Sequence, residues 1–281
     1  MAIVGPGRVG QALGKLLAGA GVPVRYVAAR RLAAARRAVR FIGSGQAVDL
    51  RDPRLAEASV ILLTTADSGI SEVARNLTGL RRDWSGKVVL HTCGSLPAAV
   101  LQPLARRGAA IGSLHPFQTI PNPRAGVRNL KKCYWGIEGD AAARRVAERY
   151  VKALEGVAFR VKPSAKTLYH LAAFLVCPTV VTLMDRSERL LRRSGVPAKI
   201  ARPMLGRFVA ETVRNFVEFG GRRALTGPAA RGDWSTLERH LAALRRTSPE
   251  VVPVYIELVR AMLRLVGRRP PRFRRGKARI F

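Results

Sequence analysis

Short apolar runs and helical patterns alternate along the first half of the chain. The apolar runs that predict strands are Ala2–Val4, Val24–Ala28, Val60–Thr64, Val88–His91 and Ala109–Leu114. Helical spacing between them predicts helices at Gln11–Ala20, Leu32–Arg40, Ile70–Leu77 and Ala98–Arg106. Two further strands, Tyr134–Ile137 and Val157–Val161, enclose a helix at Ala141–Leu154. Repeated strand and helix units are typical of an α/β domain with a mostly parallel sheet.

The pattern changes after Lys162-Pro163, where strand signals stop and long helical segments follow at about 164–194, 198–219, 234–246 and 249–266. We therefore expect a Rossmann-type domain over 1–162, an all-α domain over 163–266, and a basic, disordered tail over 267–281. The stretch Thr167–Met184 approaches the ~20 apolar residues of a membrane span. Polar residues and Pro178 interrupt it, so we expect the centre of a helical domain or dimer and no membrane.

Composition indicates the broad class of protein to which the chain belongs. With 281 residues, 48% of them hydrophobic, the chain can form two domains with buried cores. Cys93, Cys133 and Cys177 are too far apart for a metal pattern, and a glycine turn stands where a secretory signal would begin. We expect a cytoplasmic protein with reduced thiols and no bound metal.

The formal charge of +32 predicts attraction to polyanions. The 50 basic residues comprise nine lysines and 41 arginines spread along the chain, as a bias towards arginine codons would also produce. No nucleic-acid recognition motif accompanies the charge, so a specific nucleic-acid partner is not expected.

A glycine-rich turn carries the first functional signal. Gly5-Pro6-Gly7-Arg8-Val9-Gly10 matches G-x-G-x-x-G between a predicted strand and a helix, the context in which this motif holds a dinucleotide pyrophosphate. The next strand ends in Arg30-Arg31, where an acid would favour NAD and arginine accommodates the 2′-phosphate of NADP. NADP is therefore the expected cofactor, with NAD less favoured. Thr64, Thr65 and Asp67, after the strand at Val60–Thr64, should border it, and Asp67 is equally placed to cap a helix.

Two histidines come at the ends of predicted strands, where open parallel sheets bind their ligands. His91 opens His-Thr-Cys-Gly-Ser95, and His115 opens His-Pro-Phe-Gln118-Thr. Either ring is suited to proton transfer near the nicotinamide, with Ser95 and Gln118 as substrate contacts. A loop tie through a backbone hydrogen bond is the alternative for each histidine.

Further candidates lie in the helical half. Lys166, Tyr169 and His170 share one helix face at i, i+3 and i+4, and the lysine is a candidate proton donor. The alternative is a surface lysine beside a buried Tyr–His pair. The loop Leu225–Asp233 contains Thr226 and Arg231, which are candidate substrate contacts, whereas Asp233 looks like a helix cap.

Taken together, GPGRVG, HTCGS, LHPFQTI, the Tyr169-His170 helix and LTGPAARGD with His240-Leu241 resemble the family that carries the domain of unknown function 2520 behind a Rossmann-like domain. This family is similar, at a distance, to pyrroline-5-carboxylate reductase and to the 6-phosphogluconate and 3-hydroxyisobutyrate dehydrogenases. The resemblance implies a C-terminal domain like that of 6-phosphogluconate dehydrogenase, which supports a homodimer and completes the active cleft.

The chain departs from that family at two places: Cys93 replaces a serine, and Cys177-Pro178 replaces Ser-Asn. In the related hydroxyacid dehydrogenases an asparagine works with the catalytic lysine, so Pro178 weakens the assignment of that role to Lys166. The main hypothesis is an NADP(H)-dependent oxidoreductase acting on a small, anionic carbonyl, imine or hydroxy compound. The alternative is a non-catalytic NADP-binding sensor or scaffold with a basic surface.

Overall fold

The computed structural model describes residues 1–269, so the predicted basic tail lies mostly outside the described residues. The chain divides into two compact units, Met1–Val181 and Thr182–Phe281. The first combines a sheet with helices, and the second is helical in its described part. Strands end with β8 (Val157–Arg160), close to the predicted boundary at residue 162. The compact division comes later, because the first half of the long helix α7 (Lys166–Arg193) belongs to the first unit.

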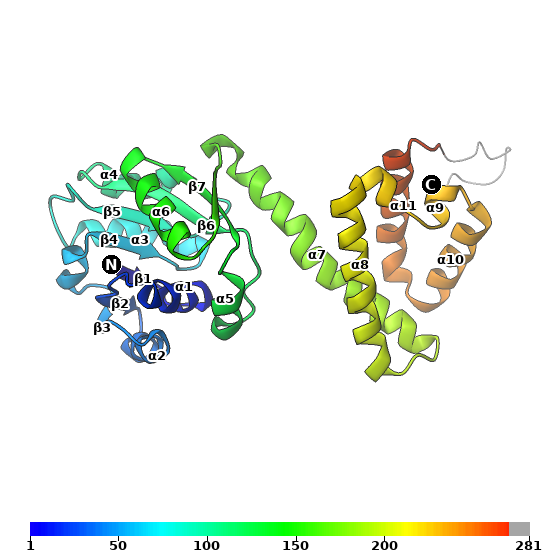
Figure 1. Ribbon diagram of the computed structural model, residues 1–281, viewed down its shortest axis with the longest axis horizontal. Helices are drawn as coiled ribbons and strands as arrows, with labels where there is room; N and C mark the ends of the chain where they lie inside the picture. The colour runs from blue at the N-terminus through cyan, green and yellow to red at the C-terminus, as the bar shows by residue number, and fades with distance from the viewer. Residues whose placement is uncertain (270–281) are drawn as a thin grey trace. The chain divides into compact units, whose positions relative to one another are not determined.

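The first unit is built on one eight-stranded sheet with the order β3-β2-β1-β4-β5-β6-β7-β8 (Figure 1). Its strands are β1 (Ala2–Val4), β2 (Tyr26–Ala29), β3 (Gln46–Asp49), β4 (Val60–Leu63), β5 (Val88–His91), β6 (Ala110–Pro116), β7 (Tyr134–Gly139) and β8. All neighbouring strands are parallel except β6 and β7. The mostly parallel α/β sheet expected from the sequence is therefore confirmed. Strand β3 was not predicted, because Val48 is its one buried residue and no apolar run marks it.

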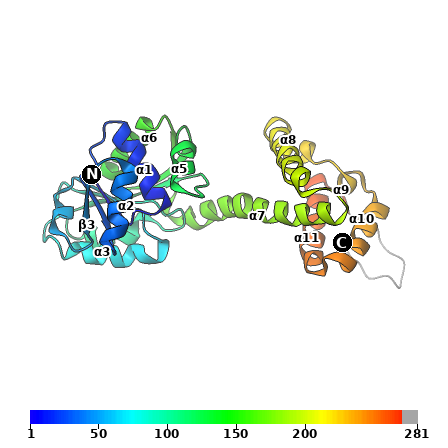
Figure 2. The same cartoon turned by 90° about the horizontal axis from the view of Figure 1, so that it is seen from below.

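Helices cover both faces of this sheet, and each face has its own hydrophobic core. On one face α1 (Arg8–Gly19), α2 (Leu32–Ile42), α5 (Pro123–Asn129) and α6 (Ala141–Ala153) surround a core that includes Leu13, Ile42 and Tyr150. On the other, α3 (Ile70–Thr78) and α4 (Gln102–Ala105) enclose Ile70 and Leu104. Figure 2 shows α1, α5 and α6 towards the top of the first unit and α3 at its bottom. Helix α5 was not predicted, and its short, polar sequence explains why.

The order of the strands determines where a ligand can bind. Strand β1 lies between β2 and β4, so the chain leaves β1 towards one side of the sheet and later returns on the other. In open α/β sheets the crevice at such a reversal, outside the carboxyl ends of the strands, is the binding site. The turns after β1, β2 and β4 meet there.

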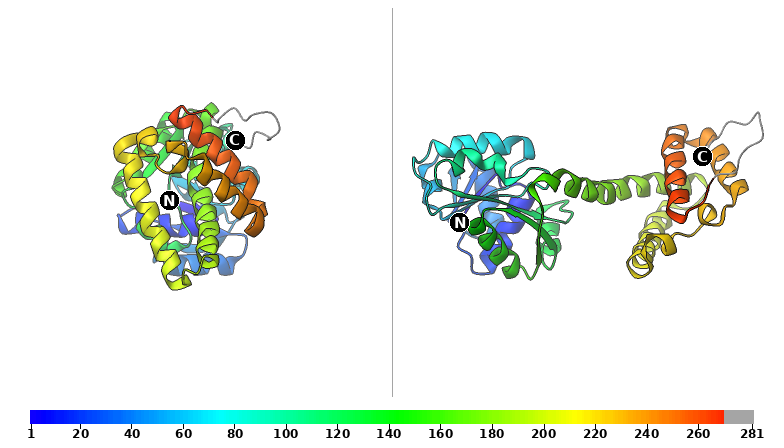
Figure 3. Two further views of the ribbon diagram at one scale, coloured as in Figure 1. Left: turned by 90° about the vertical axis from the view of Figure 1, so that its right-hand side faces the viewer. Right: turned by 90° about the horizontal axis from the view of Figure 1, so that it is seen from above.

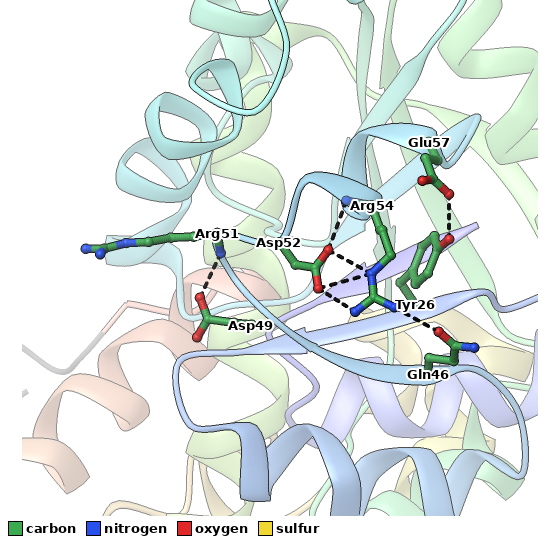
Figure 4. A network of polar contacts seen from close by, with 7 residues as sticks. All are labelled: Tyr26, Gln46, Asp49, Arg51, Asp52, Arg54 and Glu57. Atoms are coloured by element: carbon green, nitrogen blue, oxygen red, sulfur yellow. Dashed lines mark hydrogen bonds and ion pairs between the residues drawn. The ribbon is translucent and has the colours of Figure 1, made fainter.

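A polar network fixes the β2–β3 edge of the sheet (Figure 4). Arg54 pairs with Asp52 and donates to Gln46 on β3, while the Tyr26 hydroxyl donates to Glu57 at 2.6 Å. Asp49 accepts the backbone N–H of Arg51, and Asp52 caps the short 3-10 helix η1 (Pro53–Glu57). Together these contacts hold the segment after β3 against the sheet.

Helix α7 is continuous across Pro178, which has no N–H to donate to the carbonyl of Phe174. The hydroxyl of Thr179 donates to that carbonyl instead, at 3.3 Å. By length and composition, the segment Pro163–Arg193 is apolar enough to cross a membrane, which is weak evidence because core helices pass the same test. The most apolar 18-residue stretch of this segment has no part buried within the chain.

The described part of the second unit holds four further helices, which Figure 3 shows from two directions. They are α8 (Ala198–Ala224), α9 (Pro228–Arg231), α10 (Trp234–Thr247) and α11 (Val252–Val266). Leu237 and Leu241 of α10 pack with Val259 and Leu263 of α11 in a small core. Asp233 caps α10 by accepting the N–H of Thr236, as the sequence predicted.

Candidate active site

The glycine turn after β1 has the geometry that its motif requires. Gly5 has φ +78°, and a Cβ atom there would lie 2.3 Å from Cγ2 of Thr65 and 2.9 Å from its backbone. A Cβ atom at Gly10 would lie 2.2 Å from Oγ1 of Thr64. Only glycine allows the turn to approach β4 so closely. No side chain caps α1, whose first N–H groups therefore remain available to an anion.

A hollow of about 490 Å³ adjoins this turn. Gly5, Pro6 and Gly7 line one wall, and Arg30 and Arg31 line another. Both arginines are exposed, and Arg31 stands at the N-cap of α2. Thr65 also lines the hollow, and its Oγ1 is buried without a hydrogen-bond partner in the described structure. A glycine turn, two cations and an unsatisfied hydroxyl suit a phosphorylated ligand.

Of the other residues expected at the cofactor, Thr64 lines this hollow and Asp67 does not. Thr64 lines the hollow, and its hydroxyl donates to the carbonyl of Gly5 at 2.7 Å. Asp67 does not line it, because the 3-10 helix η2 (Asp67–Gly69) begins there and the carboxylate accepts from Ser95 at 3.5 Å. That Asp67 borders the cofactor stays a prediction, and its neighbours Ser68 and Gly69 line the hollow.

His115 stands where two further hollows meet. The first, of about 460 Å³, continues from Thr64 and Thr65 past Arg8 and Val9 to His115 and Gln118. The second, of about 400 Å³, extends from His115 and Gln118 along α7 to Phe174 and Pro178. Shared residues thus connect the three hollows in series, from the arginines after β2 to the first half of α7.

Helix α7 brings an aromatic partner to His115. The Tyr169 hydroxyl lies 2.7 Å from His115 Nδ1, and the ring of His170 is 6.1 Å from that of His115. Two glycines make this packing possible. A Cβ atom at Gly136, the residue opposite His115 on β7, would lie 2.8 Å from the Tyr169 hydroxyl. A Cβ atom at Gly94 would lie 2.7 Å from His115 Nε2.

Electrostatics keeps His115 neutral. Burial and the nearby charge of Lys166 lower the pKa of His115 to about 3. Burial raises the pKa of Tyr169, so its hydroxyl stays protonated and can donate to Nδ1. A neutral imidazole that accepts at Nδ1 carries its proton on Nε2. The pair can therefore present a ring N–H donor to a ligand.

Lys166 is buried rather than on the surface, with only 1% of its area exposed. Its Nζ donates to the hydroxyl of Ser113 at 2.9 Å and to the carbonyl of Cys93 at 3.1 Å. Burial lowers the pKa of Lys166, and the charge of Glu138 opposes that shift. The alternative was a surface lysine beside a buried Tyr–His pair. The structure has the opposite arrangement, because Lys166 is buried and Tyr169 and His170 are each partly exposed. Lys166 does not line any of the three hollows.

His91 is fully buried, and its Nδ1 accepts the backbone N–H of Cys93 at 3.2 Å. Burial, assisted by the charge of Lys166, lowers its pKa to about 4. The sequence left a proton-transfer role and a loop tie open for this residue. Its contacts match the loop tie, because the ring does not reach the hollows.

The tentative substrate residues separate into two groups. Gln118 lines both hollows beside His115, and Tyr169 contacts His115 directly. Ser95 is partly buried and contacts Asp67 and the Cys93 thiol instead. Thr226 and Arg231 belong to the second unit.

Among the site residues that the sequence did not indicate are Ser113, Glu138, Gly136 and Phe174. Ser113 and Glu138 are buried polar residues inside apolar strands, and that pattern was the available signal. Glu138 accepts the N–H of Ala98 at 2.7 Å and the hydroxyl of Ser113 at 3.4 Å. Such contacts depend on the pairing of β6 with β7, which spacing along the chain does not reveal.

Comparison with known domain families identifies both halves. Residues 1–116 match the Rossmann-like domain, and residues 133–262 match a domain of unknown function, number 2520. No curated protein matches the chain. The resemblance inferred from the sequence motifs is thereby confirmed.

Solved structures share the fold over nearly the whole chain. A protein from Bacteroides fragilis, described as a proposed NADP oxidoreductase, is 22% identical with a TM-score of 0.76, covering 93% of this chain and 96% of its own. A pyrroline-5-carboxylate reductase from Coxiella burnetii is 15% identical with a TM-score of 0.62, covering 95% and 96%. A reductive aminase from Aspergillus terreus, solved with NADPH and ethyl levulinate, is 17% identical with a TM-score of 0.65, covering 94% and 93%.

Proposed function

We propose that this chain, which carries a Rossmann-like domain followed by a domain of unknown function 2520, is an NADP(H)-dependent oxidoreductase. The observation that carries the proposal is the series of three connected hollows, which leads from Arg30 and Arg31 past the glycine turn to His115 and α7. A dinucleotide needs such a series, with cations at one end and a reaction chamber at the other. NADP oxidoreductases with the same fold support it.

The residues fit NADP in a definite order. Arg30 and Arg31 would hold the 2′-phosphate, and the N–H groups at the start of α1 would hold the pyrophosphate. The nicotinamide would reach the hollow lined by Thr64, Thr65 and His115. When bound, NADP(H) supplies or accepts a hydride. The chain supplies the position of the reacting groups and a hydrogen-bond donor.

His115 is the residue we assign to the reacting group of the substrate. Its Nε2–H would donate to the oxygen or nitrogen of a carbonyl or imine, or of the corresponding hydroxy compound, while Tyr169 holds Nδ1. A neutral histidine acts as an electrophile in this way in other enzymes. His170 and Gln118 would border the substrate.

The hollow of about 400 Å³ along α7, which we call the substrate chamber, is mainly apolar. Among its lining residues, all in the described first unit, none is lysine, arginine, aspartate or glutamate. Phe117, Phe174 and Pro178 provide much of its wall. We therefore propose a small substrate with an apolar body. The anionic group expected from the sequence depended on Arg231, and it stays a prediction.

Thermal-shift titration tests the cofactor assignment, because a ligand that binds only the folded protein raises its stability by RT ln(1 + [L]/Kd). NADPH is expected to stabilise the protein more than NADH at equal concentration and fixed salt. Replacing Arg30 and Arg31 by alanine should remove that preference. Replacing Arg36 and Arg37, exposed arginines of α2 that do not line the hollow, is the matched control.

Each outcome has a consequence. Absence of a shift with either nucleotide would refute the proposal. Binding of NADPH without oxidation across a panel of ketones, imines and aldehydes would favour the sensor or scaffold alternative. That alternative draws support from Pro178, which lines the substrate chamber where the resembling family has asparagine.

We also propose a cytoplasmic homodimer. Helix α7 exposes Leu168, Phe174, Leu175, Val176 and Val181, and α8 separately exposes Phe208, Phe216 and Val217. Monomeric proteins seldom expose apolar patches of this extent. A second copy offers the same apolar helices, as a two-fold interface requires. Contacts with that copy would cover the exposed apolar residues of α7 and of α8.

A further inference from the structure

A buried chain of polar contacts lies outside the linings of the three hollows, and the proposed function assigns it no role. It runs from Lys166 on α7 to Ser113 on β6 and Glu138 on β7, and ends at the backbone N–H of Ala98. Lys166, Ser113 and Glu138 are 1%, 0% and 7% exposed. A buried ammonium costs free energy unless it is paired and hydrogen-bonded, so its presence requires an explanation.

We propose that Lys166 is a positioning residue, whose fixed charge holds His115 as a neutral imidazole with its proton on Nε2, and that Ser113 and Glu138 hold that charge in place. This inference rests on the proposed function, because it assigns the state of the group that faces the substrate. Lys166 is therefore not the proton donor, which agrees with its absence from the walls of the chamber.

The geometry supports this role in two ways. Lys166 opens α7, and Tyr169, one turn later, places its hydroxyl 2.7 Å from His115 Nδ1. The ammonium also lies 5.9 Å from the centre of the Tyr169 ring. Anchoring the ammonium on Cys93 and Ser113 therefore also fixes the first turn of the helix, from which Tyr169 reaches His115.

The direction of the hydrogen bond between Tyr169 and His115 depends on charge. When His115 is neutral, the Tyr169 hydroxyl donates to Nδ1, and Nε2 keeps its proton for a ligand. When the ring is protonated, both nitrogens become donors and the hydroxyl must accept. A fixed positive charge near the ring disfavours the second state.

Other titratable groups also face this cluster. His170 and Tyr169 from α7 and His91 from β5 surround His115, while Glu138, Cys93 and Asp67 act on Lys166. Of the groups that act on the charge of His115, Lys166 has the largest effect after burial itself. The carboxylate of Glu138 works on Lys166 in the opposite sense to burial.

Nuclear magnetic resonance of the ring nitrogens tests the proposal on the cofactor-free protein, so no enzymatic activity is needed. The chain has only four histidines, and single His→Asn variants assign their signals. In the unchanged protein, His115 should remain neutral with its proton on Nε2 from pH 8 down to pH 5. Lys166→Met should raise the titration midpoint of His115 by about 1–3 pH units, the usual effect of one close charge.

Two further variants separate charge from structure. Lys166→Gln keeps a hydrogen-bond donor without the charge, and it should raise the midpoint as Lys166→Met does, which keeps the test decisive if the methionine variant does not fold. Lys162→Met removes an exposed lysine four residues earlier and should leave the midpoint unchanged. An unchanged His115 midpoint in a folded Lys166→Gln or Lys166→Met protein would overturn the proposal, and so would an Nδ1-protonated ring in the unchanged protein.

The same measurement distinguishes this proposal from the proposed function. If NADPH fails to bind but the His115 midpoint moves as described, the oxidoreductase assignment fails and the electrostatic coupling stands. If NADPH is bound and oxidised while the midpoint stays fixed, the assignment stands and Lys166 is only an anchor for α7.

Discussion

Replacing Gly5 by alanine tests how closely the first turn approaches β4. The residue has φ +78°, and holding alanine in that region costs about 1–2 kcal/mol. The new Cβ would also lie 2.3 Å from Thr65 Cγ2 and 2.9 Å from the Thr65 backbone, and overpacking of this kind costs about 1–3 kcal/mol. The first unit should therefore lose about 2–5 kcal/mol of unfolding free energy.

Gly43→Ala is the matched control. Gly43 has φ +82°, but a Cβ atom there would meet nothing within 4 Å, so this variant carries the backbone cost alone. Urea unfolding followed by tryptophan fluorescence measures both variants. Trp84 and Trp135 are fully buried in the first unit, and Trp234→Phe removes the signal of the second.

The double variant Gly5→Ala with Thr65→Ser completes the test. Serine lacks Cγ2, so the shortest contact disappears while the contacts with the backbone remain, and part of the lost stability should return. Equal losses in Gly5→Ala and Gly43→Ala would refute the close approach of the turn to β4. The fit of a pyrophosphate to this turn would then lose its geometric basis.

Two further predictions concern buried charge and association. The pKa of His91 is lowered from 6.5 to about 4 in the folded protein, so its neutral form stabilises the fold fully above pH 6.5, and about 3 kcal/mol is lost as the pH falls towards 4. His91→Asn keeps an acceptor for Cys93 and should flatten this part of the curve of unfolding free energy against pH, whereas a curve as steep as that of the unchanged protein would contradict the assignment. Phe208, 71% exposed on α8, should lie in the dimer interface, so Phe208→Asp should reduce the mass found by light scattering from twice the 30.6 kDa of one chain to that value. The exposed neighbour Arg207 provides the control Arg207→Asp, and a monomeric unchanged protein would contradict the dimer.

The fold could be predicted well where apolar runs reflect burial on both faces. Strands β1, β4 and β5 have every residue buried, and each was predicted within one residue of its observed end. Strand β3 lies at the edge of the sheet with one buried residue, so its position depends on pairing with β2 and not on its own sequence. Helix α5 likewise packs on α1 through few apolar residues.

The sequence predicts those site residues that lie at or just after the ends of strands. The glycine turn, Arg30, Arg31 and His115 all line connected hollows. Spacing could not separate His115 from His91, because both lie at the ends of strands and only packing shows that one ring is fully buried. Spacing along the helix also places Lys166 on the same face as Tyr169 and His170. The burial of Lys166, however, depends on its contacts with Ser113 and, through Ser113, with Glu138, which lie on distant strands.

Under the proposed function, the residues that choose the cofactor and those that choose the substrate come from separate stretches of the chain. The hollow with Arg30 and Arg31 is lined by residues 5–76, whereas the chamber along α7 is lined by residues 115–178, and the two share no residue. The exposed segment at residues 81–83 lies between these stretches in the sequence. If the proposed function is right, chimeras joined in that segment should take their nucleotide preference from one parent and their substrate preference from the other. Selection could then alter either preference by exchanging one block of the gene while leaving the other intact.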